Sequence, residues 1–338
     1  MDNSQVIPMC NITSTKLTQY YYYTDCRRKR EVSDKSMQNL KDNKVKGKYS
    51  YKSSKNLTKI VNNWYSCVYF DMIEKNEDVK KINKRFSFVT LTLSSQQEHD
   101  DKYIKRNMLG AFIQEIKRKE SIINYLHCSE AQQNGNIHFH IILDKYIHHK
   151  TIRDIWNNIQ DNHGYLDKFE IKHNHRNPNS TDVHALNKIH NIPAYLVKYF
   201  TKDEKRRHIE GRLWGCSDNL RQIECYNDAI DNETDEFLLN LKNDTACRKY
   251  YGDYWSIWEY RHMINYLDTS SSFINRVKAH YLEQSHVLSG KTTQKQLAAQ
   301  RNFNAPKVAP KITLAPQVAN PQKKVTPRKQ LSLFQSLY

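Results

Sequence analysis

Two histidines one residue apart form the pattern in this sequence that is most typical of a metal site. His138, Phe139 and His140 lie in IHFHII, a run of apolar and β-branched residues that predicts a strand. Because side chains alternate across a strand, both imidazoles would point to one face and Phe139 to the other. A second H-x-H triplet, at 173–175, lies in a polar stretch. The triplet at 138–140 is therefore the candidate for metal binding.

Glu130 stands eight residues before His138, on the other side of Asn134-Gly135, which is a strong hairpin signal. Folding the hairpin would bring the Glu130 carboxylate beside the two imidazoles. Such a ligand set leaves coordination positions open and admits Mg²⁺ or Mn²⁺ as well as Zn²⁺. We expect a divalent metal, Mg²⁺ or Mn²⁺, at this site. The alternative is a pair of hydrogen-bonded core histidines and a surface glutamate.

The segment YLVKYFTK carries the groups that could act as nucleophiles. Tyr195 and Tyr199 are spaced i, i+4 on one face of a predicted helix, and Lys198 and Lys202 each follow a tyrosine by three residues. A tyrosine hydroxyl attacks a phosphodiester only when a metal polarises the phosphate or a nearby lysine favours the phenolate. The spacing leaves open which lysine acts and whether one or both tyrosines react. Amphipathic packing is the alternative for each tyrosine.

The elements that must position these residues alternate in type. Strands are expected over 86–93, 121–131, 137–143 and 165–173, and helices over 100–119, 151–164 and 183–202. The order β-α-β-β-α-β-α predicts an α+β fold, with a small antiparallel sheet of the ferredoxin-like type and helices on one face.

The combined motifs resemble the HUH endonuclease superfamily, specifically the rolling-circle replication initiators of phages and plasmids. FVTLTL (88–93) is similar to their first motif, Glu130 with the H-x-H triplet to their metal motif, and Tyr195, Tyr199 and Lys202 to the paired-tyrosine motif of the phage A-protein and gene II type. The resemblance covers about 86–215 and includes GRLWG at its end. YLVK also fits the one-tyrosine pattern, so the tyrosine count stays open.

The resemblance implies a five-stranded antiparallel palm, a divalent metal and nicking of single-stranded origin DNA. Nicking would leave a 5′-phosphotyrosine link and a free 3′-OH primer, and the strand would later be religated. Two other interpretations remain: an HUH transposase or relaxase, and a non-catalytic regulator that binds single-stranded or origin DNA. A covalent protein–DNA adduct distinguishes the enzymes from the regulator.

Positive charge is concentrated in two stretches of the chain. The 338 residues carry 53 Lys and Arg against 36 Asp and Glu, a net charge of +17, and the stretches 27–59 and 286–338 together account for +18. Such blocks favour a polyanionic partner, either nucleic acid or an anionic membrane surface. We predict four parts, which are a basic and partly disordered N-terminal arm (1–84), the endonuclease domain (85–217), a mostly helical region (218–285) and a disordered basic tail (286–338).

Neither a membrane span nor a secretory signal is expected, because the sequence has no apolar run of about 18 residues and no basic start followed by one. Its 7 cysteines show no C-x-x-C spacing, which argues against a disulfide framework and a zinc ribbon. The aromatic stretch at 250–260 is interpreted as core at helical spacing, with base stacking as the alternative.

The tail ends in QLSLF, whose residues Gln330, Leu331, Leu333 and Phe334 resemble the pentapeptide that docks bacterial polymerases on the sliding clamp. This resemblance implies a bacterial host cytoplasm and the host clamp as a partner. The segment 285–293 resembles a phosphate-binding loop but has serine in place of its first glycine and no strand before it. No built-in helicase is therefore expected, and a host helicase is a further expected partner.

Overall fold

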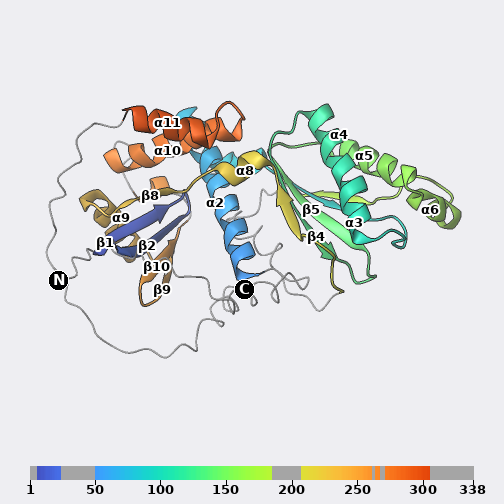
Figure 1. Ribbon diagram of the computed structural model, residues 1–338, viewed down its shortest axis with the longest axis horizontal. Coiled ribbons are helices and arrows are strands. Elements are labelled where there is room, and N and C mark those ends of the chain that lie inside the picture. Colours follow the sequence, from blue (N-terminus) through green and yellow to red (C-terminus); the bar gives the residue numbers. More distant parts are fainter. Residues whose placement is uncertain (1–5, 24–49, 185–206, 261–262, 267–270, 305–338) are drawn as a thin grey trace, which may run out of the picture. The chain divides into compact units, whose positions relative to one another are not determined.

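Two five-stranded antiparallel sheets organise the chain (Figure 1). The computed structural model describes residues 6–23, 50–184, 207–260, 263–266 and 271–304. Within them, strands and helices combine into an α+β architecture, as the sequence predicted.

The first sheet has the order β6-β3-β5-β4-β7, and every neighbouring pair is antiparallel. Its strands are β3 (Ser87–Leu91), β4 (Tyr125–Ala131), β5 (Ile137–Leu143), β6 (Thr181–His184) and β7 (Trp214–Cys216). The expected strands over 86–93, 121–131 and 137–143 are confirmed. Strand β5 lies in the centre and is buried along its whole length, so its side chains have fixed surroundings on both faces.

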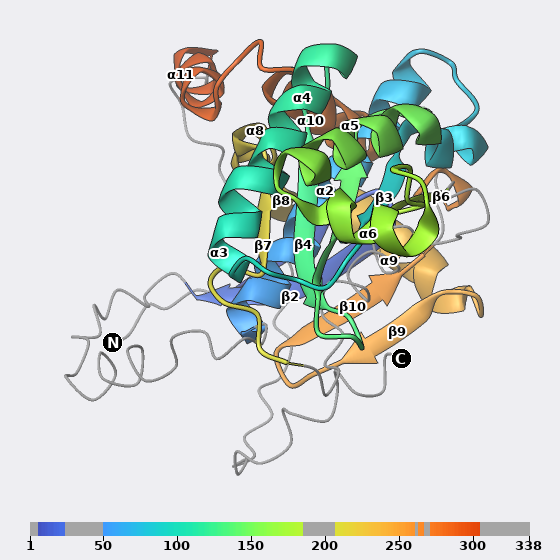
Figure 2. The same ribbon diagram turned by 90° about the vertical axis from the view of Figure 1, so that its right-hand side faces the viewer.

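Helices cover one face of this sheet (Figure 2). They are α3 (Asp101–Tyr103), the π-helical η2 (Ile104–Leu109), α4 (Gly110–Glu120), α5 (His149–Asn162) and α6 (Tyr165–His173). Phe112 of α4 and Trp156 of α5 are fully buried against Phe139 and Ile141 of β5 in one core. This core takes the odd-numbered side chains of β5, which leaves the even-numbered His138 and His140 on the opposite face.

The strand predicted over 165–173 is wrong, because these residues form α6. Gly164, at a φ of 75°, turns the chain between α5 and α6, and Asn174 ends α6 in the left-handed region. YLDKFEIKH alternates weakly between apolar and polar residues but also pairs Phe169 with His173 at i, i+4, which a helix satisfies. The predicted helix over 183–202 begins inside β6, and its residues 185–202 lie outside the described residues.

The second sheet has the order β8-β1-β2-β10-β9 and joins the N-terminal segment to much later residues. Its strands are β1 (Val6–Ile12), β2 (Lys16–Tyr23), β8 (Tyr226–Ala229), β9 (Arg248–Tyr251) and β10 (Trp255–Glu259). The N-terminal arm predicted over 1–84 is therefore wrong for 6–23, which form a paired hairpin. Cys10 and Ile12 are buried at alternating positions of β1, and Leu17 is buried on β2.

The prediction of an N-terminal arm over 1–84 is also wrong for residues 51–74. They form the 24-residue helix α2 (Tyr51–Glu74), which is followed by η1 (Val79–Arg85). Ser50 caps α2 by accepting a hydrogen bond from the Ser53 amide. The helix buries Leu57, Val61 and Trp64 at helical spacing between Lys and Asn residues. Residues 24–49 lie outside the described residues.

The region 218–285 contains more helix than strand among its described residues, as predicted, but β8, β9 and β10 also lie within it. Its helices are α8 (Asp218–Gln222), α9 (Asn232–Asn243), η4 (Met263–Asn265) and α10 (Ser272–Leu288). Phe70 of α2 stacks on Tyr281 of α10 at a ring-centroid distance of 5.4 Å, and the Tyr281 hydroxyl donates to the Ile12 carbonyl at 2.6 Å. These contacts place α2 and α10 against the N-terminal hairpin.

Residues 286–304, which were predicted as part of the disordered tail, contain helical structure. Helix α10 continues to Leu288, whose carbonyl accepts hydrogen bonds from Asn124 and Asn219, and α11 (Gln294–Asn304) follows. A helix precedes Gly290 and Lys291 where a phosphate-binding loop requires a strand. The clamp-like motif at 330–334 lies outside the described residues.

The aromatic stretch at 250–260 forms the β9–β10 hairpin rather than a helix. Trp258 and Tyr260 are buried, as the core interpretation predicted, whereas Tyr251 and Tyr254 are 62% and 66% exposed. The spacing of the buried rings is that of a strand. None of the six cysteines within the described residues forms a disulfide bond. None of the helices in the described part combines the length and the apolar character needed to cross a lipid bilayer.

Candidate functional site

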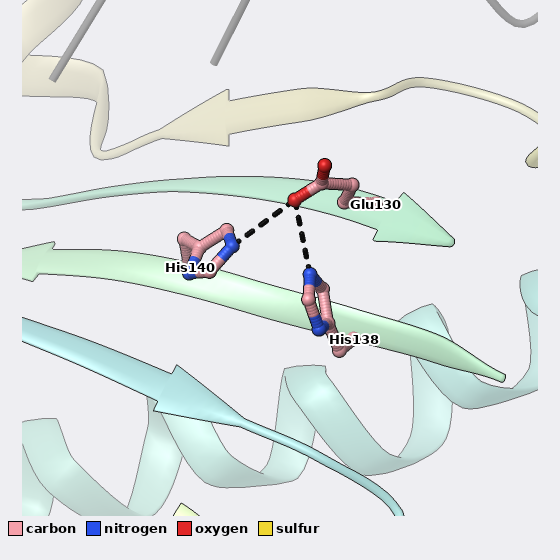
Figure 3. Close-up of side chains that lie close together, drawn as sticks. All are labelled: Glu130, His138 and His140. Carbon is pink, nitrogen blue, oxygen red and sulfur yellow. Dashed lines mark hydrogen bonds and ion pairs between the residues drawn. The ribbon is translucent and has the colours of Figure 1, made fainter. Parts of the chain in front are cut away.

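The β4–β5 hairpin brings the three predicted ligands together. In the register of the two strands, Glu130 lies directly opposite His138, and Cys128 lies opposite His140. Side chains that face each other across an antiparallel pair point to the same side of the sheet. Glu130 therefore extends over β5 between the two imidazoles, on the face away from the helices (Figure 3).

One carboxylate oxygen of Glu130 contacts both rings. Its Oε2 lies 3.0 Å from Nε2 of His138 and 3.2 Å from Nε2 of His140, and the two ring centroids are 4.6 Å apart. The histidines are 9% and 7% exposed. Burial on its own raises the pKa of Glu130, but the hydrogen bonds from the two imidazoles outweigh it and hold this pKa below its ordinary value. The carboxylate is thus kept ionised for a cation.

Thr90 on β3 orients the His140 ring. Its Oγ1 lies 3.0 Å from Nδ1 of His140, because the two residues are paired in the β3–β5 register. A His140 tautomer that donates Nδ1–H to this hydroxyl would present its Nε2 lone pair to a cation, in place of the Nε2–H that is bonded to Glu130. Phe88 stacks against the same ring at a centroid distance of 5.3 Å and an interplanar angle of 19°. Neither residue was assigned a role from sequence, although Thr90 lies within the first motif.

The strand register defines the rest of this face. Cys128, His140, Thr90 and Asp182 are paired in turn from β4 to β6, so their side chains share one side of the sheet. Neighbouring strands lie about 4.8 Å apart, which separates the backbones of Asp182 and His140 by about 10 Å, and Asp182 is not part of the donor group of Glu130, His138 and His140. Asp182 is a carboxylate at the edge of the site that no sequence motif had revealed.

Arg207, the first described residue after 184, forms an ion pair with the buried carboxylate of Asp101. Both Nη atoms of Arg207 donate to Asp101 at 2.8 Å, and the Glu210 amide donates to the same carboxylate at 2.9 Å. Arg207 also donates through Nε to the Gly135 carbonyl in the β4–β5 turn. Residue 207 is thereby fixed beside the hairpin that carries Glu130 and His138.

GRLWG, the last segment of the resemblance, contributes β7 and its approach. An added Cβ at Gly215 would lie 2.6 Å from Nε2 of His127, so glycine at this position leaves room for the partly buried His127 ring. Burial lowers the pKa of His127 to about 4 and keeps this imidazole neutral. His127 lies on the other face of β4 from Glu130. It packs against Gly215 and is not part of the donor group of Glu130, His138 and His140.

The donor set fits a divalent cation. One atom from each of Glu130, His138 and His140 lies within 4.8 Å of the others, and this is the one such group of three in the described part of the chain. Adjacent ligands about 2.1 Å from an octahedral ion lie about 3.0 Å apart, close to the two distances from Glu130 Oε2. The buried Nδ1 of His138 has no hydrogen-bond partner among the described residues, so only His140 has an orienting contact there.

The predicted nucleophiles Tyr195 and Tyr199, and the lysines Lys198 and Lys202, lie outside the described residues. The described chain leaves the sheet at His184, opposite Phe88, and returns at Arg207 beside the β4–β5 turn. The second H-x-H triplet lies at the end of α6, where His173 stacks on Phe169 at 4.3 Å. It does not belong to the Glu130 cluster.

Residues 86–204 match the family model for replication-associated proteins of the ORF2 and gene II protein type. The match contains Glu130, His138 and His140, the three predicted ligands, and extends across the segment with the two tyrosines. No curated protein and no solved structure matches the chain. The family match indicates a role in DNA replication, and it is consistent with a rolling-circle replication initiator.

Proposed function

We propose that this protein initiates rolling-circle replication by nicking single-stranded origin DNA with a tyrosine nucleophile. The observation that carries the proposal is the cluster of Glu130, His138 and His140, which offers three convergent donors within a segment that matches a replication-associated family. A bound Mg²⁺ or Mn²⁺ would polarise the scissile phosphate and stabilise the charge that develops on it.

The protein's own groups would carry out the transfer. The hydroxyl of Tyr195 or Tyr199 attacks phosphorus and loses its proton, and the bond from phosphorus to the 3′ oxygen breaks. The 3′ oxygen takes up a proton and leaves as a free hydroxyl, while the 5′ phosphate stays on the tyrosine. Lys198 or Lys202 would favour the phenolate or neutralise the pentacovalent phosphorus. The free 3′-OH can prime synthesis, and reversal of the same step religates the strand.

Two tyrosines spaced i, i+4, which is one turn of the helix predicted from the sequence, suit repeated rounds of cleavage. While one tyrosine holds the old 5′ end, the other can cleave the regenerated origin and accept the new 5′ end. Both would be needed for several rounds, whereas either one suffices for a first nick.

Nicking of single-stranded origin DNA by variants of the three ligands tests this function. His138→Ala, His140→Ala and Glu130→Ala should each lower the rate at least about 100-fold in Mn²⁺ or Mg²⁺, because two donors hold a cation weakly and orient it poorly. His149→Ala, which removes an exposed imidazole on α5, should leave the rate unchanged. Undiminished cleavage by either of the two site histidine variants would refute the metal assignment.

A further inference from the structure

A pocket of about 320 Å³ lies near the strand ends that carry the metal-site histidines. Its wall combines the segment that follows β3 (93–96), the β4–β5 turn through Asn134 and Asn136, and the outer face of α6. Ligand pockets commonly start at about 300 Å³, so this volume suits a small group such as one nucleotide. The buried Oγ of Ser95 in this wall has no hydrogen-bond partner among the described residues.

Helix α6 presents positive charge to the pocket. Lys168 and Lys172 are one turn apart and both line it, and Lys168 forms an ion pair with Glu98. No ion pair is recorded for Lys172 among the described residues. Asp167 and Glu170, the acidic residues of α6, both form ion pairs with Arg176. The pocket therefore has a net positive wall, which favours an anion such as a phosphate.

The same helix supplies an aromatic surface. Phe169 and His173 both line the pocket and stack on each other at 4.3 Å with an interplanar angle of 29°. His175 contacts the Phe169 ring edge-on at 5.2 Å. Half-exposed rings beside lysines are the combination by which proteins bind single strands, because bases stack on the rings and the cations contact the backbone.

The pocket lies close to the candidate site along strand β5. Asn136 in its wall precedes His138 by two residues, which is about 7 Å along a strand. The Asn136 side chain is fixed, since Nδ2 donates to the Ser95 carbonyl at 2.8 Å and Oδ1 accepts from the Gln97 amide at 2.9 Å. Because α6 covers the face opposite to the histidines, a strand of DNA at the metal site would pass around the end of β5 to reach the pocket.

We propose that this pocket binds one nucleotide of the single-stranded DNA that flanks the cleaved position. Its phosphate would contact Lys172 and Lys168, and its base would stack on Phe169 and His173. This inference rests on the proposed nicking function for the identity of the ligand. It gives the H-x-H triplet at 173–175 a role in DNA binding that is separate from the metal.

Equilibrium binding without cleavage tests the pocket. The probe is a fluorescein-labelled oligothymidylate, titrated by anisotropy in EDTA over a range of about 50 to 200 mM NaCl. Lys172→Gln should reduce the slope of log affinity against log salt by about 0.7, the loss of one phosphate contact on a single strand. Phe169→Ala should weaken binding roughly 5-fold or more and leave the slope unchanged, because stacking releases no counterions.

Lys150→Gln, an exposed lysine at the start of α5, is the matched control for charge and should leave the slope unchanged. Photocrosslinking with 4-thiothymidine in the same oligonucleotide should label the peptide that contains Phe169 and His173. Equal slopes for Lys172→Gln and Lys150→Gln, with no crosslink to α6, would overturn the proposal. Because EDTA prevents metal-dependent nicking, this result is independent of whether the protein cleaves DNA.

Discussion

At the residue scale, the convergence of Glu130, His138 and His140 was predictable from sequence, and metal binding by them stays a prediction. Strand alternation places the histidines together, and the Asn134-Gly135 turn fixes the register that adds Glu130. Thr90 was not predictable as a partner of His140, because their contact depends on pairing between strands that are 50 residues apart. The spacing of residues within the β4–β5 hairpin predicts the candidate ligands, whereas the residue that orients His140 follows from the pairing of β5 with the distant strand β3.

Thr90→Val should weaken Mn²⁺ binding about 10-fold, since loss of a contact that orients a ligand usually costs 10–100-fold in metal affinity. The substitution keeps the side-chain shape, so the fold should be retained. Calorimetric titration with Mn²⁺ measures the effect. Thr92→Val is the control, because the Thr92 hydroxyl donates to the Ser180 carbonyl instead of contacting a ligand. Equal affinities for the two variants would remove Thr90 from the site.

At the element scale, the strands and helices whose apolar residues repeat with one clear period were predicted correctly. Short or polar elements were not. The strands around 87–91 and 137–143 are rich in β-branched residues, and the helices over 101–120 and 149–162 keep an apolar face. Helix α6 was mistaken for a strand because its nine residues contain too few apolar positions to separate a period of 2 from 3.6. The N-terminal hairpin was missed because its partners β8 and β10 lie more than 200 residues later.

The Asp101–Arg207 pair should make stability depend on pH. Burial raises the pKa of Asp101, but hydrogen bonds from Arg207, Gln97 and the Glu210 amide outweigh it and lower this pKa from 3.8 to about 2. A depressed carboxyl pKa stabilises the fold above the unfolded value near 3.8, and that stabilisation is lost as pH falls toward 2. Asp101→Asn should therefore cost about 2 kcal/mol at pH 7 and about half as much at pH 3.

Denaturant unfolding at several pH values measures this difference. Asp154→Asn on α5 changes an exposed carboxyl and should cost little at any of them. A penalty for Asp101→Asn that is the same at pH 7 and pH 3 would show that the Asp101–Arg207 pair does not set the stability of this region.

At the scale of the whole molecule, strand pairing and the C-terminal helices differ from the predicted division into domains. Residues 6–23 belong to the second sheet with 226–259, so the N-terminal segment cannot be removed as an arm without opening that sheet. The helices α10 and α11 likewise extend the folded part to residue 304. Six of the basic residues predicted for the tail, and no acidic ones, fall in 305–338.

The clamp-like motif is a prediction at this scale, because it concerns a partner of the whole protein. A peptide of residues 322–338 should bind a bacterial sliding clamp, with Leu333 and Phe334 as apolar anchors and Gln330 as the polar one. A tethered clamp would be held near the new 3′-OH at an effective concentration of about 1 mM. Binding is measured by anisotropy against a peptide with these three residues changed to Ala. Equal affinity for the two peptides would rule out clamp docking.

The most direct test of the account is to trap and map the covalent adduct on single-stranded origin DNA in Mn²⁺. The account predicts a 5′-phosphotyrosine on Tyr195 or Tyr199, with the adduct moving to the remaining tyrosine in each single Tyr→Phe variant. The double variant Tyr195→Phe with Tyr199→Phe should form no adduct while still binding the DNA. An adduct that persists in the double variant would contradict the account, since the nucleophile would then lie elsewhere in the chain.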